Sequence, residues 1–219
     1  MKIRVHVLGS ARPLEEMFKK YKDDISVINN TNNADVVVFP GGSDINPGFY
    51  GENPIASTQT YRQNDERDYA VWNNWKNDAN KFFVGICRGA QFLNVMNGGK
   101  LWQDVNNHRI GNKKHPMIDT LTDEIIQVSS THHQMMRPNV YTGEILGIAF
   151  ESTFWESDKG LLRCDGPDEK KRGLNPKVPQ YDPEVVWYRN TKSLCYQPHP
   201  EHGGDCESHF MSLLDKLYE

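Results

Sequence analysis

Residues 82–99 of this 219-residue chain read FFVGICRGAQFLNVMNGG, which joins a strand to a helix with no linker. Phe82 to Ile86 is an apolar run of strand length, and helical spacing follows it. Cys87 stands at the bend between the two, with Gly85 and Gly89 on either side to let the backbone turn tightly. A reactive side chain at such a junction indicates a nucleophile elbow, here with cysteine in place of serine.

A cysteine in this position has chemistry that an ordinary buried cysteine lacks. The positive end of the helix dipole stabilises a thiolate, and the first N–H groups of the helix can hold a developing oxyanion. The alternative is that Cys87 is a small buried apolar residue, as most free cysteines are. The Gly-x-Cys-x-Gly frame at a strand–helix junction favours the nucleophile.

A second segment, near the end of the chain, contains a histidine and a carboxylate in a constrained backbone. Residues 197–201 read Gln-Pro-His-Pro-Glu and directly follow a predicted strand. The two prolines hold His199 in one direction, and in an extended backbone Glu201, two residues on, projects to the same side. Glu201 can therefore orient and stabilise an imidazole that acts as the base for Cys87.

Spacing also raises the alternative of a zinc site in this region. Its candidate ligands are His199, His202, Cys206 and His209. Their intervals are those of a helix, whereas Pro200 and Gly203-Gly204 interrupt any helix there. The pairing with Glu201 is therefore the favoured interpretation of His199, and a purely structural histidine is the other alternative.

The order of strands and helices predicts an α/β fold. Strand patterns occupy residues 3–8, 25–28, 34–39 and 82–86, with helical patterns from Pro13 and over residues 65–79. In the second half, strand patterns at 124–128, 144–150, 185–188 and 194–197 have few helices between them, and a last helix spans 206–218. We expect a mostly parallel central sheet flanked by helices, with an antiparallel extension in the C-terminal half.

Three details of this prediction concern particular residues. The first helix is expected to bury Leu14, Met17, Phe18 and Tyr21. The inner face of the helix over 65–79 is expected to comprise Ala70, Val71, Trp72, Trp75 and Ala79. Residues 165–183, rich in proline, glycine and lysine, are expected to form a surface excursion.

Composition limits the class of protein. A length of 219 residues suits one domain, expected over residues 1–219, and a net charge of −4 gives no basic footprint for nucleic acid. The sequence has no apolar run of about 18 residues and no signal-type N-terminus, so neither a membrane span nor export is expected. The cysteines are then expected to be thiols in a cytoplasmic protein: Cys87, Cys164, Cys195 and Cys206.

Five blocks together resemble the class I glutamine amidotransferase superfamily, whose fold is flavodoxin-like. In chain order they are FPGGSDINP at 39–47 with YGE at 50–52, DERD at 65–68, the run from Gly85 to Asp104, STHHQ at 130–134 and QPHPE at 197–201. Each block alone is moderately specific, but all five in the family's order are strongly specific. The branch that they resemble most is the γ-glutamyl-γ-aminobutyrate hydrolases.

The resemblance implies a role for each matching residue. Cys87 would be the nucleophile, His199 the acid and base, and Glu201 the residue that orients it. The backbone N–H groups of Gly42 and Arg88 would form the oxyanion hole. The substrate would be bound by Gln91, Asp44, Asn46, His132, His133 and Gln134, and a structural role for one of the two histidines stays open.

The implied reaction is hydrolysis of a γ-glutamyl amide through a thioester on Cys87, which releases glutamate and an amine and requires no metal or organic cofactor. One alternative is a glutaminase subunit that supplies ammonia to a separate synthetase or ligase, and another is a catalytically silent binding protein. A homodimer is also left open. The chain departs from the family where Asp-Gly-x-x-Glu-Ala is expected, because residues 182–187 read DPEVVW. At the position before His-Pro-Glu, where the family has an aromatic residue, this chain has Pro198. These departures leave the amine part of the substrate unidentified.

Overall fold

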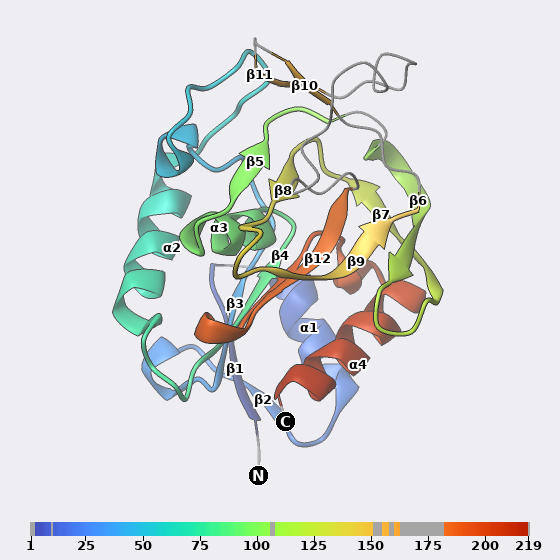
Figure 1. The fold of residues 1–219 in the computed structure, drawn as a ribbon. Coiled ribbons are helices and arrows are strands. Elements are labelled where there is room, and N and C mark those ends of the chain that lie inside the picture. Colours follow the sequence, from blue (N-terminus) through green and yellow to red (C-terminus); the bar gives the residue numbers. More distant parts are fainter. Residues whose placement is uncertain are drawn as a thin grey trace.

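The computed structural model describes residues 3–9, 11–105, 108–150, 155–157, 160–162 and 182–218. Its centre is a nine-stranded sheet with the order β2-β1-β3-β4-β13-β12-β9-β6-β7 (Figure 1). In that order the strands are β2 (Ile25–Val27), β1 (Ile3–Val7), β3 (Val36–Phe39), β4 (Phe82–Ile86), β13 (Ser193–Tyr196), β12 (Pro183–Tyr188), β9 (Glu144–Ala149), β6 (Arg109–Asp119) and β7 (Ile125–Thr131).

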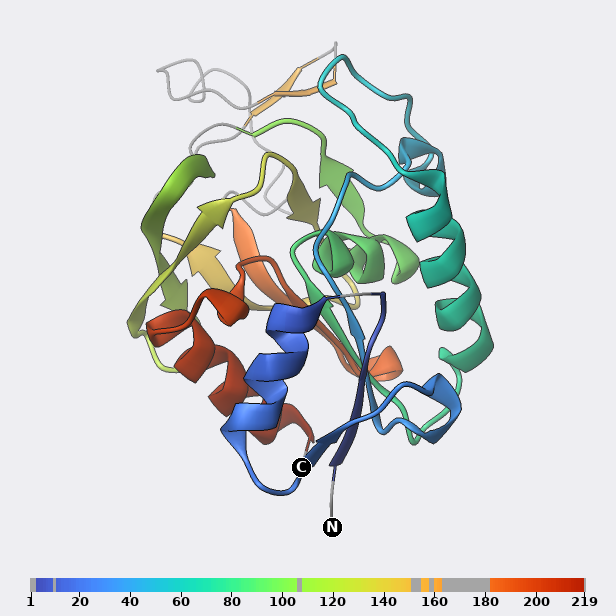
Figure 2. The ribbon, with the colours of Figure 1, turned by 180° about the vertical axis from the view of Figure 1, so that it is seen from behind.

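Helices cover both faces of the sheet. The α-helices of the described residues are α1 (Arg12–Tyr21), α2 (Arg62–Trp75), α3 (Arg88–Met96) and α4 (Asp205–Tyr218). Seen from the front and from behind, α1 and α4 lie on one face and α2 and α3 on the other (Figures 1 and 2). Short 3-10 helices lie in the connections: η1 (Thr31–Asn33), η2 (Pro47–Tyr50), η4 (Arg189–Thr191) and η5 (Pro200–His202).

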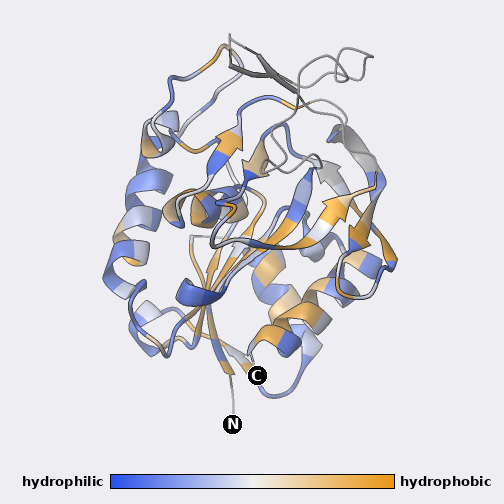
Figure 3. Cartoon of the chain, in the orientation of Figure 1, coloured by the Kyte–Doolittle hydropathy of each residue, from blue (hydrophilic) through white to orange (hydrophobic). Residues whose placement is uncertain are grey.

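The first five strands of the sheet, from β2 to β13, are parallel. This was predicted for the N-terminal strands, whereas β13 comes from the half expected to extend the sheet in antiparallel sense and instead pairs in parallel with β4. Every residue of β3 and of β4 is buried, because helices pack on both sides of these strands. In Figure 3 the centre of the sheet is accordingly apolar, while the outer faces of the helices are mainly hydrophilic. The parallel half therefore forms the rigid base on which the loops at the strand ends are held.

The first helix agrees with its prediction and the second agrees in part. Leu14, Met17 and Phe18 of α1 are buried, and Tyr21 packs partly against the same core. In α2, however, Ala70 is exposed, and the buried residues are Asp65, Asp68 and Trp72. Ala79 is also exposed and lies beyond the helix end at Trp75. The predicted inner face is thus right for Val71, Trp72 and Trp75, which pack against the core. It missed Asp65 and Asp68, because carboxylates look solvated in sequence and these two have a buried partner.

The predicted antiparallel extension is confirmed. Strand β12 runs antiparallel to β13, and β9, β6 and β7 continue in the same alternating sense. The long strand β6 was not predicted, because its sequence RIGNKKHPMID is mostly polar. It pairs along much of its length with β7, so partnering rather than its own pattern places it in the sheet.

Two small pairs of strands lie outside the main sheet: β5 (Lys100–Trp102) with β8 (Met135–Arg137), and β10 (Trp155–Ser157) with β11 (Gly160–Leu162). Most of the expected excursion at 165–183, like Cys164, lies outside the described residues. Among the described residues, the helices are too short or too polar to cross a membrane.

Candidate active site

The residues expected to react lie beyond the carboxyl ends of three neighbouring parallel strands. The pairing registers of β3, β4 and β13 end these strands at the same level of the sheet. The loops that leave them carry Gly41, Cys87 and His199, respectively. Ligands of open α/β sheets bind at this edge, in the crevice outside the carboxyl ends of the strands.

Cys87 forms a sharp bend between β4 and α3. Its backbone has φ 51° and ψ −110°, a left-handed region that residues with a side chain rarely adopt. Its N–H donates to the carbonyl of Tyr196 at 3.0 Å, which ties the bend to β13. Helix α3 begins at the next residue, so the thiol stands at the N-terminus of the helix, as the elbow hypothesis requires.

The flanking glycines have a different purpose from the one expected. The positive φ belongs to Cys87 itself, while Gly85 and Gly89 are required where backbones approach closely. A Cβ on Gly89 would lie 1.9 Å from the carbonyl oxygen of Phe39, and one on Gly85 would lie 2.3 Å from the oxygen of Gly89. The Gly-x-Cys-x-Gly frame thus seats the start of α3 against β3 and β4.

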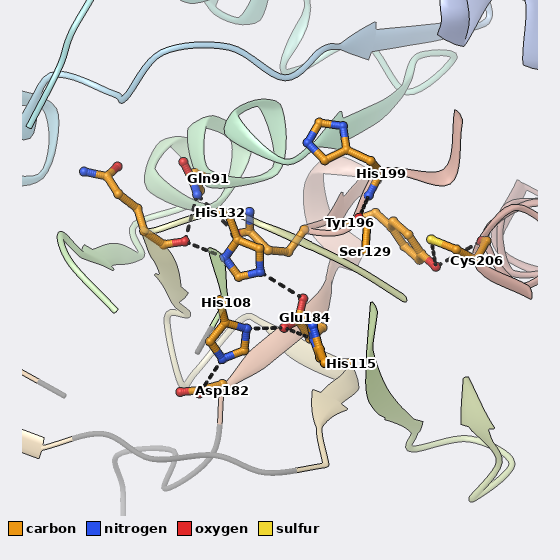
Figure 4. A network of polar contacts seen from close by, with 12 residues as sticks. Gln91, His108, His115, Ser129, His132, Asp182, Glu184, Tyr196, His199 and Cys206 are labelled. Carbon is orange, nitrogen blue, oxygen red and sulfur yellow. Dashed lines mark hydrogen bonds and ion pairs between the residues drawn. The ribbon is translucent and has the colours of Figure 1, made fainter. Parts of the chain in front are cut away.

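His199 is held by two contacts within the chain. Its Nδ1 lies 2.7 Å from Oε1 of Glu201, and its backbone N–H donates to Oγ of Ser129 at 2.8 Å (Figure 4). Burial opposes the charged imidazole, but hydrogen bonds to Cys87 and Glu201 outweigh burial and raise the pKa of His199 to about 10. The structure therefore brings together the three side chains that the sequence selected, although Cys87 is more than 100 residues from His199 and Glu201 in the chain.

Gly41 lies between the cysteine and the histidine. A Cβ at this position would be 3.0 Å from Cε1 of His199 and 3.6 Å from Cβ of Cys87. The absent side chain therefore lets the imidazole stand close to the thiol. The Pro-Gly-Gly turn after β3 predicted a bend, but only the tertiary structure shows which glycine borders the histidine.

The two residues expected to form the oxyanion hole are neighbours. A Cβ on Gly42 would lie 3.4 Å from Cδ of Arg88, in ordinary van der Waals contact. The N–H of Arg88 opens α3 and has no acceptor within the helix. Arg88 follows Cys87 in the sequence, and Gly42 follows Gly41, which borders Cys87. That an oxyanion accepts hydrogen bonds from these two N–H groups stays a prediction.

The side chain of Arg88 is a feature that the sequence did not reveal. It is buried and forms ion pairs with Asp65, at 2.5 Å, and with Asp68. These aspartates belong to the DERD block, to which the sequence assigned no role. The signal was their spacing of three residues, which puts both on one face of a helix. Their partner fixes the position of α2 against the first turn of α3.

Gln91, one turn along α3 from Cys87, lies in a buried cluster of three glutamine residues, which we call the amide cluster. The side-chain amide of Gln91 donates to the carbonyl of Gln134 at 3.1 Å and lies 3.2 Å from Oε1 of Gln197. All three residues are buried. Gln91 and Gln134 were expected at the substrate, whereas Gln197 was noted only as part of the histidine block.

Asp44, two residues after Gly42, contacts His133. Nε2 of His133 lies 2.9 Å from Oδ1 of Asp44, and Nδ1 lies 3.5 Å from Oδ1 of Asp104. The hydrogen bond to Asp44 raises the pKa of His133. Asn46 is placed differently, because its side-chain oxygen accepts from the N–H of Gly48 and caps η2.

His132 faces away from this pair, into the protein. Its Nδ1 lies 2.9 Å from the carbonyl of Gln134, and its Nε2 lies 3.6 Å from Oε2 of Glu184 (Figure 4). Burial lowers the pKa of His132. On the far side of Glu184 stands His108, where burial opposes the charge but the Asp182 and Glu184 carboxylates raise the pKa to about 9.

The alternative zinc set near the C-terminus does not come together as a group of four. His199, Glu201 and His202 offer ligand atoms within 4.8 Å of one another. Cys206 and His209, by contrast, both contact the hydroxyl of Tyr196.

A hollow of about 460 Å³ lies at the opposite end of the strands, beside Asp35 and Phe82, and borders none of the expected site residues.

The geometry of the elbow agrees with a comparison to known protein families. The model of the peptidase C26 family matches residues 8–149, about two thirds of the chain. The chain belongs to the peptidase C26 family. The matched range includes the cysteine elbow and the glycine loop but stops before His199.

Relatives in two organisms carry glutamine amidotransferase names. A glutamine amidotransferase-like protein of Lactococcus lactis is 29% identical over 172 residues, which cover 70% of this chain and 67% of that protein. A Schizosaccharomyces pombe protein with a glutamine amidotransferase name is 30% identical, over 74% of this chain and 66% of its own length. The chain thus spans about two thirds of these relatives. C26 membership and these relatives support amide-bond hydrolysis as the general activity.

Solved structures confirm the fold class. A GMP synthase subunit of Thermoplasma acidophilum superposes with a TM-score of 0.59 at 13% identity, over 99% of this chain and 96% of that chain. A glutamine amidotransferase of Thermotoga maritima gives a TM-score of 0.57 at 13% identity, over 99% and 84% of the two chains. Both likenesses show that this C26 chain has the class I glutamine amidotransferase fold.

Proposed function

We propose that the chain is a cysteine-dependent hydrolase of γ-glutamyl amide bonds, which releases glutamate and an amine. One observation carries the proposal: Cys87 stands at a helix N-terminus beside an imidazole whose other nitrogen contacts Glu201. A thiol, a base and an orienting carboxylate in this arrangement are the components of acyl transfer through a covalent intermediate.

The reaction proceeds in two halves. The Cys87 thiolate attacks the γ-carbonyl, and the oxyanion accepts hydrogen bonds from the N–H groups of Gly42 and Arg88. Each such donor contributes about 3 kcal/mol to stabilising the transition state. His199 protonates the departing amine, which leaves a γ-glutamyl thioester. His199 then takes a proton from water, the resulting hydroxide attacks the thioester, and glutamate and the free thiol are formed.

The pocket is proposed to recognise the two parts of the substrate separately. Gln91, one turn of α3 beyond the nucleophile, is assigned to the glutamyl part. The amine part is assigned to His133 and its partner Asp44, on the loop that follows the oxyanion-hole glycine. A third polar group, the carboxylate of Asp104, lies 3.5 Å from His133 and adds acceptors for an amine with N–H groups.

A second candidate is a glutaminase subunit that supplies ammonia to a separate synthetase. The observation in its favour is that relatives carry glutamine amidotransferase names, and that one structural neighbour is named as part of a GMP synthase. Such a glutaminase would have no need of the Asp44–His133 pair, because ammonia is too small to reach it. We therefore rank it second.

The test is a kinetic comparison of the purified chain on glutamine and on γ-glutamyl derivatives of larger amines. The chain alone should have the higher kcat/KM on a larger amine, and Cys87→Ser should abolish both activities. His133→Ala should reduce the preference by about tenfold, the equivalent of one good polar contact, while slowing glutamine hydrolysis less. His6→Ala is the matched control, because this imidazole contacts Thr31 near β1, outside the proposed pocket.

The outcome distinguishes the candidates. An inert chain that becomes a glutaminase only when a synthetase is added would establish the second candidate. Full activity in Cys87→Ser would overturn both, since each depends on the same thiol.

A further inference from the structure

A second group of reactive side chains lies inside the protein, at the antiparallel half of the sheet. It consists of His108, His115, His132 and Glu184, which we call the histidine cluster (Figure 4). Glu184 is on β12 and His115 on β6, while His108 precedes β6 and His132 follows β7. Three stretches of the chain, around β6, after β7 and in β12, therefore meet at one carboxylate.

The ligand-type atoms of this cluster are close together. Oε1 of Glu184 lies 2.9 Å from Nε2 of His115 and 3.1 Å from Nδ1 of His108, and its Oε2 lies 3.6 Å from Nε2 of His132. Neighbouring ligands of a tetrahedral zinc ion are about 3.4 Å apart, given metal–ligand bonds of about 2.1 Å. The ligand atoms of His108, His115 and Glu184 all lie within 4.8 Å of one another, which suits one small ion between these three residues, while His132 stands outside this group.

The cluster is removed from solvent. Glu184 is fully buried, and His108 and His132 expose 2% and 3% of their surface. Water cannot complete the hydrogen bonds of such groups, so each inward-facing polar atom requires a partner inside the protein. Several do not have one: Nδ1 of His108, Nε2 of His132 and Oε2 of Glu184 form no hydrogen bond among the described residues.

The outer contacts of the rings explain why the inward atoms are unpartnered. Nδ1 of His132 faces the carbonyl of Gln134 at 2.9 Å, and a carbonyl only accepts, so this nitrogen carries the hydrogen. Nε2 of His108 faces Oδ2 of Asp182 at 2.8 Å and carries its hydrogen for the same reason. Without an ion, protons balance the cluster, since Nε2 of His115 donates to Glu184 and the carboxylates raise the pKa of His108. A metal ion can take the place of these protons, because it binds the same lone pairs.

We propose that the histidine cluster binds one divalent transition-metal ion, with zinc as the preferred ion. His108 binds through Nδ1, His115 through Nε2 and Glu184 through its carboxylate. Two imidazoles and a carboxylate are ligands that zinc accepts. Asp182 holds the His108 ring from outside, as the outer partners of metal-binding histidines do, and His132 faces the other carboxylate oxygen of Glu184.

The ion has a structural role. Three protein ligands leave one coordination position, and because Glu184 is fully buried this position faces the protein interior and not a substrate. The ion joins β6 to β12. It therefore stabilises the antiparallel half of the sheet and takes no part in the proposed hydrolysis.

The experiment measures metal content and stability of the full chain, purified without a metal-affinity tag. Elemental analysis, after titration with zinc and removal of free metal, should find about one zinc per chain. Cobalt loaded in its place should give visible absorption bands of a tetrahedral site. Zinc added to chelator-treated protein should raise Tm by about 5 °C or more.

Variants assign the ion to the cluster. Glu184→Gln and His115→Gln should each lose most of the bound zinc. His209→Gln is the matched control, because His209 is also a partly buried histidine with a carboxylate partner, Asp119, but lies outside the cluster. It should retain the ion, as should His202→Gln, which tests the alternative group near the C-terminus.

Two results would overturn the proposal. One is a wild-type chain that binds neither zinc nor cobalt and whose Tm is unchanged by either metal, since the cluster then carries a proton where the ion is proposed. The other is a full complement of zinc in Glu184→Gln together with its loss in His202→Gln. The wild-type measurement decides the matter even if a cluster variant does not fold.

Discussion

At the scale of single residues, the candidate site depends on a few atoms in unusual positions. Cys87 holds a positive φ that costs on the order of 1–3 kcal/mol, and the hydrogen bond to Tyr196 and the packing of α3 maintain it. Gly41 leaves the space that His199 occupies. Two consequences can be measured on the cysteines and on the histidine.

Alkylation should distinguish the cysteines. Burial raises the pKa of Cys195 well above its usual value and that of Cys206 to about 11, so neither thiol is reactive near neutral pH. Cys87 stands at a helix N-terminus beside His199, a base that can take its proton. Iodoacetamide at pH 7 should therefore label Cys87 at least about tenfold faster, as measured by peptide mass spectrometry. Faster labelling of Cys195 or Cys206 would remove the physical basis for the nucleophile.

The stability conferred by His199 should depend on pH in a defined direction. Its folded-state pKa of about 10 is above the unfolded value of about 6.5, so the folded state binds the proton more tightly. The contribution is therefore complete below about pH 6.5 and is lost as pH rises through about 10. Urea unfolding of wild type and His199→Gln should differ most at pH 6, by on the order of 1 kcal/mol, and least at pH 10.

A matched pair of controls isolates the cause. His202→Gln removes an exposed neighbouring imidazole and should not reproduce the trend. In a Cys87→Ala background the window should move to lower pH, because the contact with Cys87 is one cause of the raised pKa. A difference that grows as pH rises would contradict the assignment.

At the scale of elements, the contact between α2 and α3 is an ion pair inside the protein. Arg88 at the start of α3 is 2% exposed, and its partners Asp65 and Asp68 are buried on α2. A buried ion pair adds little net stability, but removal of one partner leaves a charge without compensation. The pair therefore fixes the register of the two helices, and with it the position of the elbow.

Asp68→Asn should destabilise the protein by about 3 kcal/mol, because it leaves the buried guanidinium short of one charge. Glu66→Gln on the same helix is the control: its ion pair with Arg62 is exposed, and it should change stability by less than about 1 kcal/mol. Chemical unfolding of both variants measures the difference. Equal effects would mean that the buried contact does not hold the helices together.

At the scale of the whole molecule, the sheet has a protected centre and less protected edges. β4 lies between β3 and β13 and is buried along its length, whereas β2 is an edge strand whose residues are all partly exposed. Amide hydrogens of residues 82–86 should therefore exchange only through global unfolding, and those of 25–27 through local opening that is at least about tenfold more frequent. Hydrogen exchange with mass spectrometry tests this. Similar rates in both segments would contradict a stable central sheet.

Much of this architecture could be predicted from local patterns. Apolar runs marked β3 and β4, since strands covered on both faces must be apolar throughout, while alternating apolar residues marked β1. Cys87 and His199 were each selected by the local backbone around them, whereas the parallel pairing of β4 with β13 that brings both to one edge of the sheet came from the structure. The polar strand β6 could not be predicted, because its place depends on pairing with β7 and not on its own hydrophobicity.

Polar residues show where sequence patterns stop and tertiary structure decides. A carboxylate or histidine is usually solvated, so Asp68 and Glu184 gave no local sign of burial. The structure buries Asp68 against Arg88, and Glu184 among histidines that precede it by more than 50 residues. Burial of a charge is favourable only when a partner from elsewhere in the chain compensates it, and the pairing of such partners is a property of the folded molecule.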